Sequence, residues 1–306
     1  MYNQQDAEVN KTYPSIISDK KVKNVDSVAI VGDSAYELFT YRKDISKNYV
    51  KALNSLAMQL EGKAKVYDML VPLSSGITFP DNLRDQIKSS DQREAMVDIF
   101  DGISDKVSKV DIYDTLMSHR TEYIYYRTDH HRTELGAYYA YVDFCEAKGI
   151  TPYEITSYET KNFDGFLGSF YNDTKSKALK KNPDVVCAYY PHTNTKVKVT
   201  ASDGKKYDWT LIYDVTDYSA SMKYSAFAAG DNPITVITNE DIQDGSSCIV
   251  VKESFGNAFI PFLADHYQKI YEIDYRYWKG NVAEYADKKG VQDVILINNL
   301  SMTRNK

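Results

Sequence analysis

Short apolar runs that alternate with helix-like patterns constrain the fold of this chain more than any other feature. From Ser27 onward the runs have the length of buried strands, and between them apolar residues recur every three or four positions. This alternation predicts an α/β fold with a mostly parallel central sheet. The expected strands or extended segments are 27–34, 63–75 (ended by Pro72), 121–126, 269–278 and 291–300, with a further apolar stretch at 106–116 and a strand, tight turn and helix in 246–267. The other expected helices are 44–61, 90–103, 281–289 and one containing Leu135 to Cys145 that stops at Gly149.

The middle of the chain lacks this rhythm. Residues 196–213 alternate apolar and polar side chains around an Asp-Gly turn, which predicts a β-hairpin. We therefore expect a β-rich insertion within one α/β domain. The predicted boundaries are an N-terminal segment 1–26, a first α/β part 27–154, the insertion 155–245 and a second α/β part 246–300.

Composition excludes several classes of protein. The net charge of −6 over 306 residues and the lack of a clustered basic surface argue against nucleic acid as a partner. No run of about 18 apolar residues is present, which argues against a membrane span. Residues 1–26 lack the apolar core of a signal peptide, although a secreted protein trimmed of its signal would look the same. The three cysteines, Cys145, Cys187 and Cys248, lack zinc or redox spacing and are expected to be free thiols.

The stretch "YYRTDHHRTELGAYYAY" (125–141) holds the first candidate chemistry. Asp129 and His131 are two residues apart, so in an extended segment their side chains leave the backbone on the same side while His130 points away. A carboxylate beside an imidazole fixes its tautomer and stabilises the imidazolium, as a general base requires. A polar loop before a helix capped by Thr133 explains the same residues equally well, and both interpretations stay open here.

Ser254 lies at a strand-to-helix turn, where a hydroxyl could act as nucleophile. Capping of the helix is the simpler interpretation of Ser254 from the residues alone. Neighbouring Gly256 would allow close backbone approach to a substrate, or would complete the turn. Ser34 in "VGDS" is the rival nucleophile, as in lipase-like SGNH hydrolases, but these need a late D-x-x-H and Leu263 stands three residues before His266. Ser34 is therefore interpreted as a turn residue.

A metal-dependent hydrolase using His130 and His131 is a third hypothesis. A DHH phosphoesterase needs further upstream histidine and aspartate ligands, yet no histidine precedes His119. The sequence therefore predicts neither a metal nor an organic cofactor.

The segment 125–141 resembles the signature of the DHHW protein family, which usually reads D-H-H-W-T followed by G-A-Y-Y-A-Y. The resemblance extends over roughly 28–298. Supporting segments are "MLVPLSSGITFPDNL" (69–83), "FLGSFY" (166–171), "KYSAFAAGDNPITVI" (223–237), "VVKESFGNAFIPFLADHY" (250–267) and "DYRYW" (274–278). One position departs from the signature, because Arg132 stands where the family has tryptophan. This change implies a different substrate pocket or a site that has lost activity.

The family is similar to the SGNH-like alginate O-acetyltransferase proteins, in which a D-x-H motif precedes a separate serine. The resemblance implies a three-layer SGNH-like fold, with Asp129 and His131 as the D-x-H pair and Ser254 as nucleophile. Substrate or oxyanion contacts would come from the turn after Ser254 and from residues around it. These candidates are Gly256, Asn257, Arg276, Asn232, His130 and Arg132.

The predicted function is O-acyl transfer or ester hydrolysis, with acetyl as the expected group, on a cell-surface or extracellular polysaccharide. By analogy with alginate acetylation, a separate membrane protein could donate the acyl group. The alternative is a non-catalytic glycan-binding or cell-surface protein on the same fold. The resemblance also implies an extracellular or cell-surface location after removal of a signal.

Overall fold

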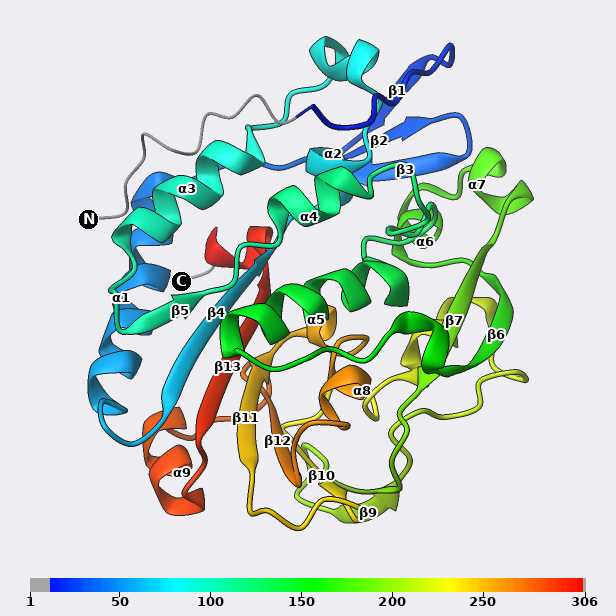
Figure 1. The fold of residues 1–306 in the computed structure, drawn as a ribbon. Coiled ribbons are helices and arrows are strands. Elements are labelled where there is room, and N and C mark those ends of the chain that lie inside the picture. Colours follow the sequence, from blue (N-terminus) through cyan, green and yellow to red (C-terminus); the bar gives the residue numbers. More distant parts are fainter. Residues whose placement is uncertain (1–11, 305–306) are drawn as a thin grey trace.

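A large mixed β-sheet runs through the middle of the molecule in the computed structural model, which describes residues 12–304 (Figure 1). Its strand order is β5-β4-β13-β11-β12-β10-β8-β9. Neighbouring strands from β5 to β12 are parallel, whereas β10, β8 and β9 are added antiparallel. The strands are β4 Lys65–Val71, β5 Val107–Lys109, β8 Thr195–Thr200, β9 Lys206–Trp209, β10 Ile234–Asn239, β11 Ser247–Lys252, β12 Lys269–Asp274 and β13 Asp293–Asn299. The sheet is therefore mixed, and the expectation of a mostly parallel sheet holds only for its β5 to β12 part.

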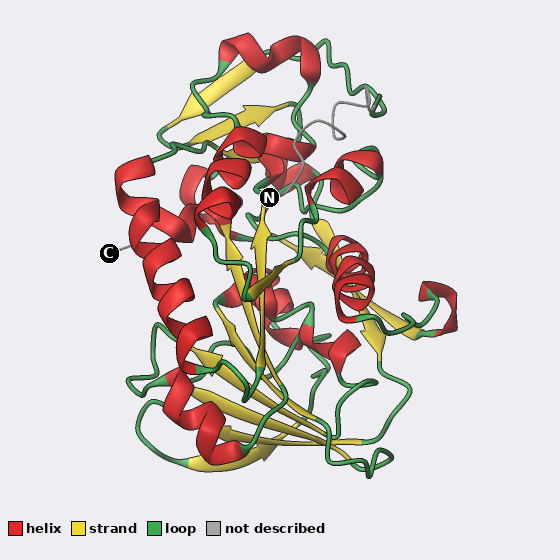
Figure 2. Ribbon diagram, turned by 60° about the vertical axis from the view of Figure 1, so that its left-hand side comes forward, coloured by secondary structure: helices red, strands yellow, loops and turns green. Residues whose placement is uncertain are grey.

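Helices lie on both sides of this sheet (Figure 2). The helix α1 contacts α3 and α9, while α5 contacts α4 and α8. Strands β11 and β13 between them are buried along their whole length, as expected for strands covered on both faces. The helices are α1 Lys43–Gln59, α2 Ser74–Ile77, α3 Gln92–Gly102, α4 Tyr113–Ser118, α5 Glu134–Lys148, α6 Ser169–Thr174, α7 Lys177–Lys181, α8 Ile260–Leu263 and α9 Val282–Lys289.

The helix α5 fixes the position of the Asp-His-His segment that precedes it. The Thr133 side chain caps its first turn by accepting a hydrogen bond from the Gly136 N–H. Gly149 ends it in the left-handed region at φ 80°, as its place after the apolar pattern predicted. A helix capped at both ends holds residues 129–131 at a defined place beside the sheet.

The strand predicted at 27–34 is present, but its assignment to the parallel sheet is wrong. Residues 27–34 contribute instead to a separate antiparallel sheet of β1 Val22–Val25, β2 Val28–Val31 and β3 Ser34–Glu37. Val31 pairs with Ser34, so Gly32 and Asp33 form a two-residue hairpin turn with Gly32 at φ 62°. Ser34 is therefore the first residue of β3 in a hairpin of the separate sheet, and it does not follow a strand of the central sheet.

The segment 155–245 is rich in strands. It contains the antiparallel pair β6 Glu159–Phe166 and β7 Asp184–Tyr190, and the predicted hairpin of β8 and β9. The strands β8 and β10 pair with each other, and β10 pairs with β12. Part of this segment thus extends the central sheet itself. That residues 155–245 form an insertion with these boundaries stays a prediction.

The carboxyl ends of β4, β11, β12 and β13 meet at one edge of the sheet, because these strands are parallel neighbours. Pro72, Ser254 and Tyr275 follow β4, β11 and β12 at this edge. In open α/β sheets this is the edge where ligands bind.

All three cysteines, Cys145, Cys187 and Cys248, are free thiols. In residues 12–304, no helix combines the length and the apolar character needed to cross a membrane. The first eleven residues of the predicted N-terminal segment 1–26 lie outside the described part of the chain.

Candidate active site

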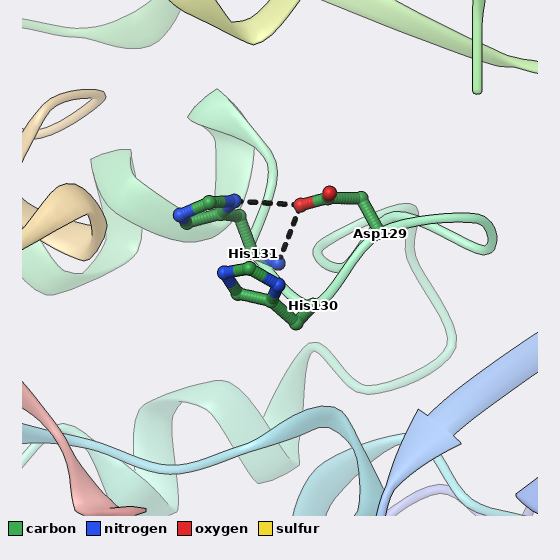
Figure 3. Close-up of side chains that lie close together, drawn as sticks. All are labelled: Asp129, His130 and His131. Carbon is green, nitrogen blue, oxygen red and sulfur yellow. Dashed lines mark hydrogen bonds and ion pairs between the residues drawn. The ribbon is translucent and has the colours of Figure 1, made fainter. Parts of the chain in front are cut away.

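Asp129 and His131 form a hydrogen-bonded pair immediately before α5 (Figure 3). Asp129 Oδ1 accepts a hydrogen bond from the His131 backbone N–H at 2.9 Å and lies 2.6 Å from the ring Nδ1. Because a carboxylate only accepts hydrogen bonds, Nδ1 carries the proton and Nε2 presents a lone pair. The structure thus joins Asp129 to His131 rather than to His130.

The other carboxylate oxygen of Asp129 is held by the start of α6. Asp129 Oδ2 accepts the Ser169 backbone N–H at 2.7 Å. Gly168 leaves room for this contact, because a Cβ there would lie 2.2 Å from the same oxygen. Burial by itself would raise the pKa of Asp129, but the His130 and His131 imidazoles lower that pKa well below its usual range. Asp129 is therefore a buried, fixed negative charge.

Ser254 brings its hydroxyl to the free side of the His131 ring. It begins the 3₁₀ turn Ser254–Gly256 directly after β11, and its Oγ lies 2.8 Å from His131 Nε2. The hydroxyl can donate to this lone pair, which completes a hydrogen-bonded Asp129–His131–Ser254 chain. Ser254 is half-buried, whereas Asp129 and His131 are buried. Of these three hydrogen-bonded residues, only Ser254 is partly exposed.

The turn after β11 is capped by Glu253 and not by Ser254. Glu253 Oε2 accepts the Phe255 N–H at 3.1 Å, and Oε1 accepts the Asn299 N–H at 2.9 Å. The Ser254 hydroxyl is also 3.3 Å from Glu253 Oε2, a longer contact than its contact with His131. Burial raises the pKa of Glu253. The cap interpretation of Ser254 is wrong, and its hydroxyl is left for His131.

Aromatic rings fix the histidine pair. Tyr224 stacks on His131 with ring centroids 4.0 Å apart and planes 15° apart, and its hydroxyl donates to the Ser254 carbonyl at 2.9 Å. Phe255 stacks on His130 at 5.6 Å, and His130 Nδ1 lies 2.7 Å from Ser169 Oγ. Burial, followed by the nearby His131, lowers the pKa of His130. His130 is therefore a neutral packing partner at neutral pH.

The residues predicted to contact an oxyanion have partners of their own. The Gly256 N–H donates to the Glu253 carbonyl at 2.9 Å, and the Asn257 N–H donates to the Ser254 carbonyl at 3.1 Å. The Asn232 side chain donates to the Ala229 carbonyl at 2.8 Å, within its own turn. These donors stabilise backbone turns around Ser254.

A buried ion network lies beside the Asp129–His131–Ser254 chain and holds Asn257 and Arg276. The fully buried Lys252 ammonium donates to Asn257 Oδ1 and lies 2.8 Å from a Glu272 carboxylate oxygen. Gly256 allows this packing, because a Cβ there would lie 2.6 Å from the Lys252 Cβ. The Arg276 guanidinium pairs with Asp274 at 2.6 Å and with Asp231 at 2.9 Å. Asn257 and Arg276 thus belong to a scaffold of paired charges under the turn.

Asp129, His130 and His131 are also the one cluster in residues 12–304 whose ligand atoms lie close enough together, within 4.8 Å, to hold a metal ion. Both oxygens of Asp129 and the Nδ1 atoms of both rings already have hydrogen-bond partners. A metal bound between these atoms would have to replace those bonds. The donor set fits proton transfer better than metal binding.

Comparison with known proteins places the chain in a family. A family model described as DHHW protein matches residues 4–273 of the 306 residues. The chain belongs to the DHHW family. No curated protein matches it in sequence.

Solved structures share the fold of this DHHW-family chain. A DHHW family protein from Eubacterium siraeum is 27% identical with a TM-score of 0.86, covering 95% of this chain and 96% of that one. Bacillus cereus PatB1 with a sulfonyl adduct is 18% identical with a TM-score of 0.73, covering 94% and 97%. The O-acetyltransferase domain of Pseudomonas putida AlgJ is 11% identical with a TM-score of 0.50, covering 94% and 93%. The last two likenesses extend to the fold alone.

Arg132, the departure from the family signature, is fully buried behind the site. None of its three guanidinium nitrogens has a hydrogen-bond partner in the described part of the chain. Burial lowers the pKa of Arg132, while the nearby Tyr125, Tyr224 and Glu253 raise it. An unpaired buried cation is costly. In this family member, Arg132 places such a cation behind the site, where the family signature has an aromatic side chain.

Sequence reasoning missed several residues that hold the candidate residues in place. These are Gly168, Ser169, Tyr224 and Glu253. All four fall in the segments "FLGSFY", "KYSAFAAGDNPITVI" and "VVKESFGNAFIPFLADHY" that carried the family resemblance. Their occurrence in those segments was the available signal, but it gave no role to any one of them.

Proposed function

We propose that this protein is a serine-dependent O-acyl esterase or transferase, with acetyl as the acyl group, that acts on an extracellular or cell-surface polysaccharide. The observation that carries the proposal is the Asp129–His131–Ser254 chain, with contacts of 2.6 Å and 2.8 Å. A nucleophile, a base within hydrogen-bond reach and a carboxylate that orients the base are the parts that acyl transfer through a serine requires.

In the first half-reaction Ser254 Oγ attacks the ester carbonyl while His131 Nε2 takes its proton. The imidazolium that forms is stabilised by Asp129, whose lowered pKa keeps it ionised. The tetrahedral intermediate collapses to an acyl-Ser254 enzyme, and His131 delivers the proton to the leaving alkoxide. Water then releases the acyl group in an esterase, whereas a glycan hydroxyl accepts it in a transferase.

The electrostatic surroundings of His131 suit this proton transfer. His130 has a lowered pKa, so it adds no second positive charge beside the imidazolium at neutral pH. The oxyanion would lie against the turn that begins at Ser254, at the carboxyl edge of β11. The N–H groups of Gly256 and Asn257 would have to share their present turn bonds with it. Asn232 and Arg276 are assigned supporting roles, because their donors are used in the turn and the ion network.

The architecture and location that we propose follow the same family. Helices on both sides of the sheet and a candidate nucleophile at its carboxyl edge suit a three-layer SGNH-like fold. By resemblance to alginate acetylation, we propose an extracellular or cell-surface location and a separate membrane protein as acyl donor. No metal and no organic cofactor take part in the proposed reaction.

Arg132 favours a second candidate function, a non-catalytic glycan-binding protein on the same fold. Its unpaired guanidinium replaces the family tryptophan close to Tyr224, which stacks on His131. If the charge has disabled the site, the fold would remain while acyl transfer is lost.

The test is hydrolysis of p-nitrophenyl acetate by the wild type and by Ser254→Ala, with intact-mass spectrometry after a short reaction. The proposal predicts turnover and an acetyl adduct in the wild type and neither in the variant. A folded wild-type protein that shows no turnover and no adduct would reject the enzyme and support the binding protein. Equal turnover in both proteins would place the chemistry elsewhere.

A further inference from the structure

An exposed row of aromatic rings extends away from the candidate site. Trp209 and Tyr213 stack with centroids 4.6 Å apart and planes 18° apart. The ring centroids of Tyr207 and Trp209 are 6.0 Å apart, and those of Tyr213 and Tyr218 are 5.6 Å apart. The two outer rings are 41% and 37% exposed. We call Tyr207, Trp209, Tyr213 and Tyr218 the aromatic strip.

The segment that carries Tyr213 and Tyr218 continues to Tyr224, which contacts both His131 and Ser254. The Tyr213 N–H donates to the Ala226 carbonyl at 2.8 Å, two residues beyond Tyr224, whose hydroxyl binds the Ser254 carbonyl. Tyr224 is six positions after Tyr218, so their Cα atoms are at most about 20 Å apart. Since most of that stretch is 3₁₀ helix, which rises only about 2 Å per residue, the separation is shorter still. An oligosaccharide of a few sugars is long enough to span this separation.

The loop that carries the strip is anchored on both sides. The buried Lys223 ammonium donates to the carbonyls of Val215 and Thr216, at 2.8 and 2.7 Å. The Ala220 carbonyl accepts the Leu167 N–H at 3.0 Å, two residues before Ser169. The strip is thus held rigidly relative to the residues that bind Asp129, as a binding surface requires.

The chemistry around the strip favours an uncharged ligand. Exposed aromatic rings offer apolar faces to the C–H faces of sugar rings. Asp217 is exposed beside the strip, Asp208 lies 3.6 Å from Lys198, and Asp214 is paired with Lys161 at 2.7 Å. Carboxylates accept hydrogen bonds from sugar hydroxyls. With Lys206 also exposed here, positive and negative charges balance around the strip, so no positive surface attracts a polyanionic glycan.

A second copy of the chain fits this surface less well. β9 is the last strand of the central sheet and pairs only with β8 there. Its exposed residues Lys206 and Asp208 place charges on the open edge. Charges on an edge strand oppose pairing with another strand.

We infer that the aromatic strip is the glycan subsite of this protein, where the rings of an uncharged polysaccharide stack on Tyr218 and Trp209 while one sugar reaches Ser254. This inference rests on the proposed function for the role of Ser254. The binding step itself does not depend on it, so the two can fail separately.

The test is to measure, by titration calorimetry, the affinity of the intact protein for cellohexaose, for chitohexaose and for an anionic hexaguluronate. The chain has two tryptophans, so Trp278→Phe leaves Trp209 as the sole fluorescence reporter. We expect a neutral hexasaccharide to bind and to change the Trp209 emission. Tyr218→Ala should weaken binding about two- to tenfold, the range expected for one aromatic stacking contact.

The matched control is Tyr153→Ala, because Tyr153 is 42% exposed and stacks on His192, away from the strip. Its affinity should equal that of the wild type. Tyr218 is a surface residue, so Tyr218→Ala tests the strip without disturbing the core.

Binding of hexaguluronate alone, binding of no hexasaccharide, or equal weakening by Tyr153→Ala would overturn the inference. So would a dimer in sedimentation that Tyr207→Ala or Tyr218→Ala dissociates, because a second copy would then cover the strip. Neutral glycan binding through Tyr218 in a protein that does not hydrolyse p-nitrophenyl acetate would uphold the subsite and reject the proposed reaction. Hydrolysis with no effect of Tyr218→Ala on glycan binding would do the reverse.

Discussion

Asp129, His131 and Ser254 have a counterpart elsewhere in the molecule, made of Asp265, His192 and Ser157. In the first group the ring nitrogens of the histidine lie 2.6 Å from the carboxylate and 2.8 Å from the serine Oγ. In the second group the corresponding distances are 2.9 Å and 3.1 Å. By residue type and spacing alone, the two groups could do the same chemistry.

The two groups differ in where their protons lie. His192 Nε2 also faces the Ser157 backbone carbonyl, an acceptor, at 3.2 Å. The Ser157 hydroxyl donates to the Glu154 carbonyl at 2.6 Å, which uses its only proton. Ser157 therefore has no proton to give to His192. His131 presents a lone pair to Ser254, which is the direction that a general base requires.

Their surroundings differ as well. Ser254 follows a buried strand at the carboxyl edge of the sheet, where Tyr224 and Phe255 pack against His131. Ser157 is exposed at the end of the 3₁₀ helix Ile155–Ser157, and Asp265 precedes β12. The comparison teaches that a triad of residue types is not sufficient, and that proton direction and burial decide which group can be catalytic.

The largest expected effect comes from removing each serine hydroxyl. Ser254→Ala should lower p-nitrophenyl acetate hydrolysis on the order of 10⁶-fold, as loss of a serine nucleophile does elsewhere. Ser157→Ala should leave the rate unchanged. Initial rates of both variants at equal concentration decide the matter, and a large loss in Ser157→Ala would reverse the assignment.

The next effect comes from the two aspartates. Asp129→Asn should reduce kcat on the order of 10⁴-fold, because the amide no longer selects the tautomer with Nδ1 protonated. Asp265→Asn should leave kcat unchanged. The measurement is kcat for both variants with their folding checked by circular dichroism, and similar losses in the two would break the distinction.

A smaller effect is expected for Tyr224→Phe. This change keeps the ring that stacks on His131 and removes only the hydroxyl that binds the Ser254 carbonyl. Loss of one such hydrogen bond should reduce kcat about two- to tenfold. Tyr224→Leu, which also removes the stacking, should lower it further. Equal rates for wild type and Tyr224→Leu would show that Tyr224 does not position the histidine.

The smallest effect concerns stability and pH. The pKa of Asp129 in the folded protein is lowered, so its carboxylate stabilises the fold above the unfolded pKa of about 3.9. That contribution is lost as the pH falls below this value, because the unfolded chain then binds the proton first. The stability gap between wild type and Asp129→Asn should therefore shrink by about 1 kcal/mol from pH 7 to pH 3. Urea unfolding at both pH values measures it, and a constant gap would contradict the lowered pKa.

Much of the α/β core could be predicted because its local signals agree with the tertiary structure. Pro72 ends β4, and Gly149 ends α5 in the left-handed region. The strand predicted at 27–34 exists as β2, but it was assigned to the central sheet because it is apolar and buried along its length, as a central strand would be. The Gly32-Asp33 pair carried the hairpin signal but was interpreted only as a turn after the strand.

In the candidate site, too, local sequence patterns did not reveal contacts between distant segments. The spacing of Asp129 and His131 pointed to their shared side of the chain, but only the fold brings Ser254, which is 123 residues away from His131, to the ring. The roles of Tyr224 and Glu253 depend on contacts between distant segments, which no local pattern encodes. Arg132 was visible as a departure, yet its complete burial without a partner follows only from the packing of the site.

The most direct test of the account is labelling with phenylmethylsulfonyl fluoride, followed by peptide mapping of every modified serine. Sulfonyl fluorides react with a serine whose hydroxyl is activated by a base. The account predicts a sulfonyl group on Ser254 in the wild type, its loss in His131→Ala, and no label on Ser157. A label on Ser157, or an equally labelled Ser254 in the protein without His131, would contradict it.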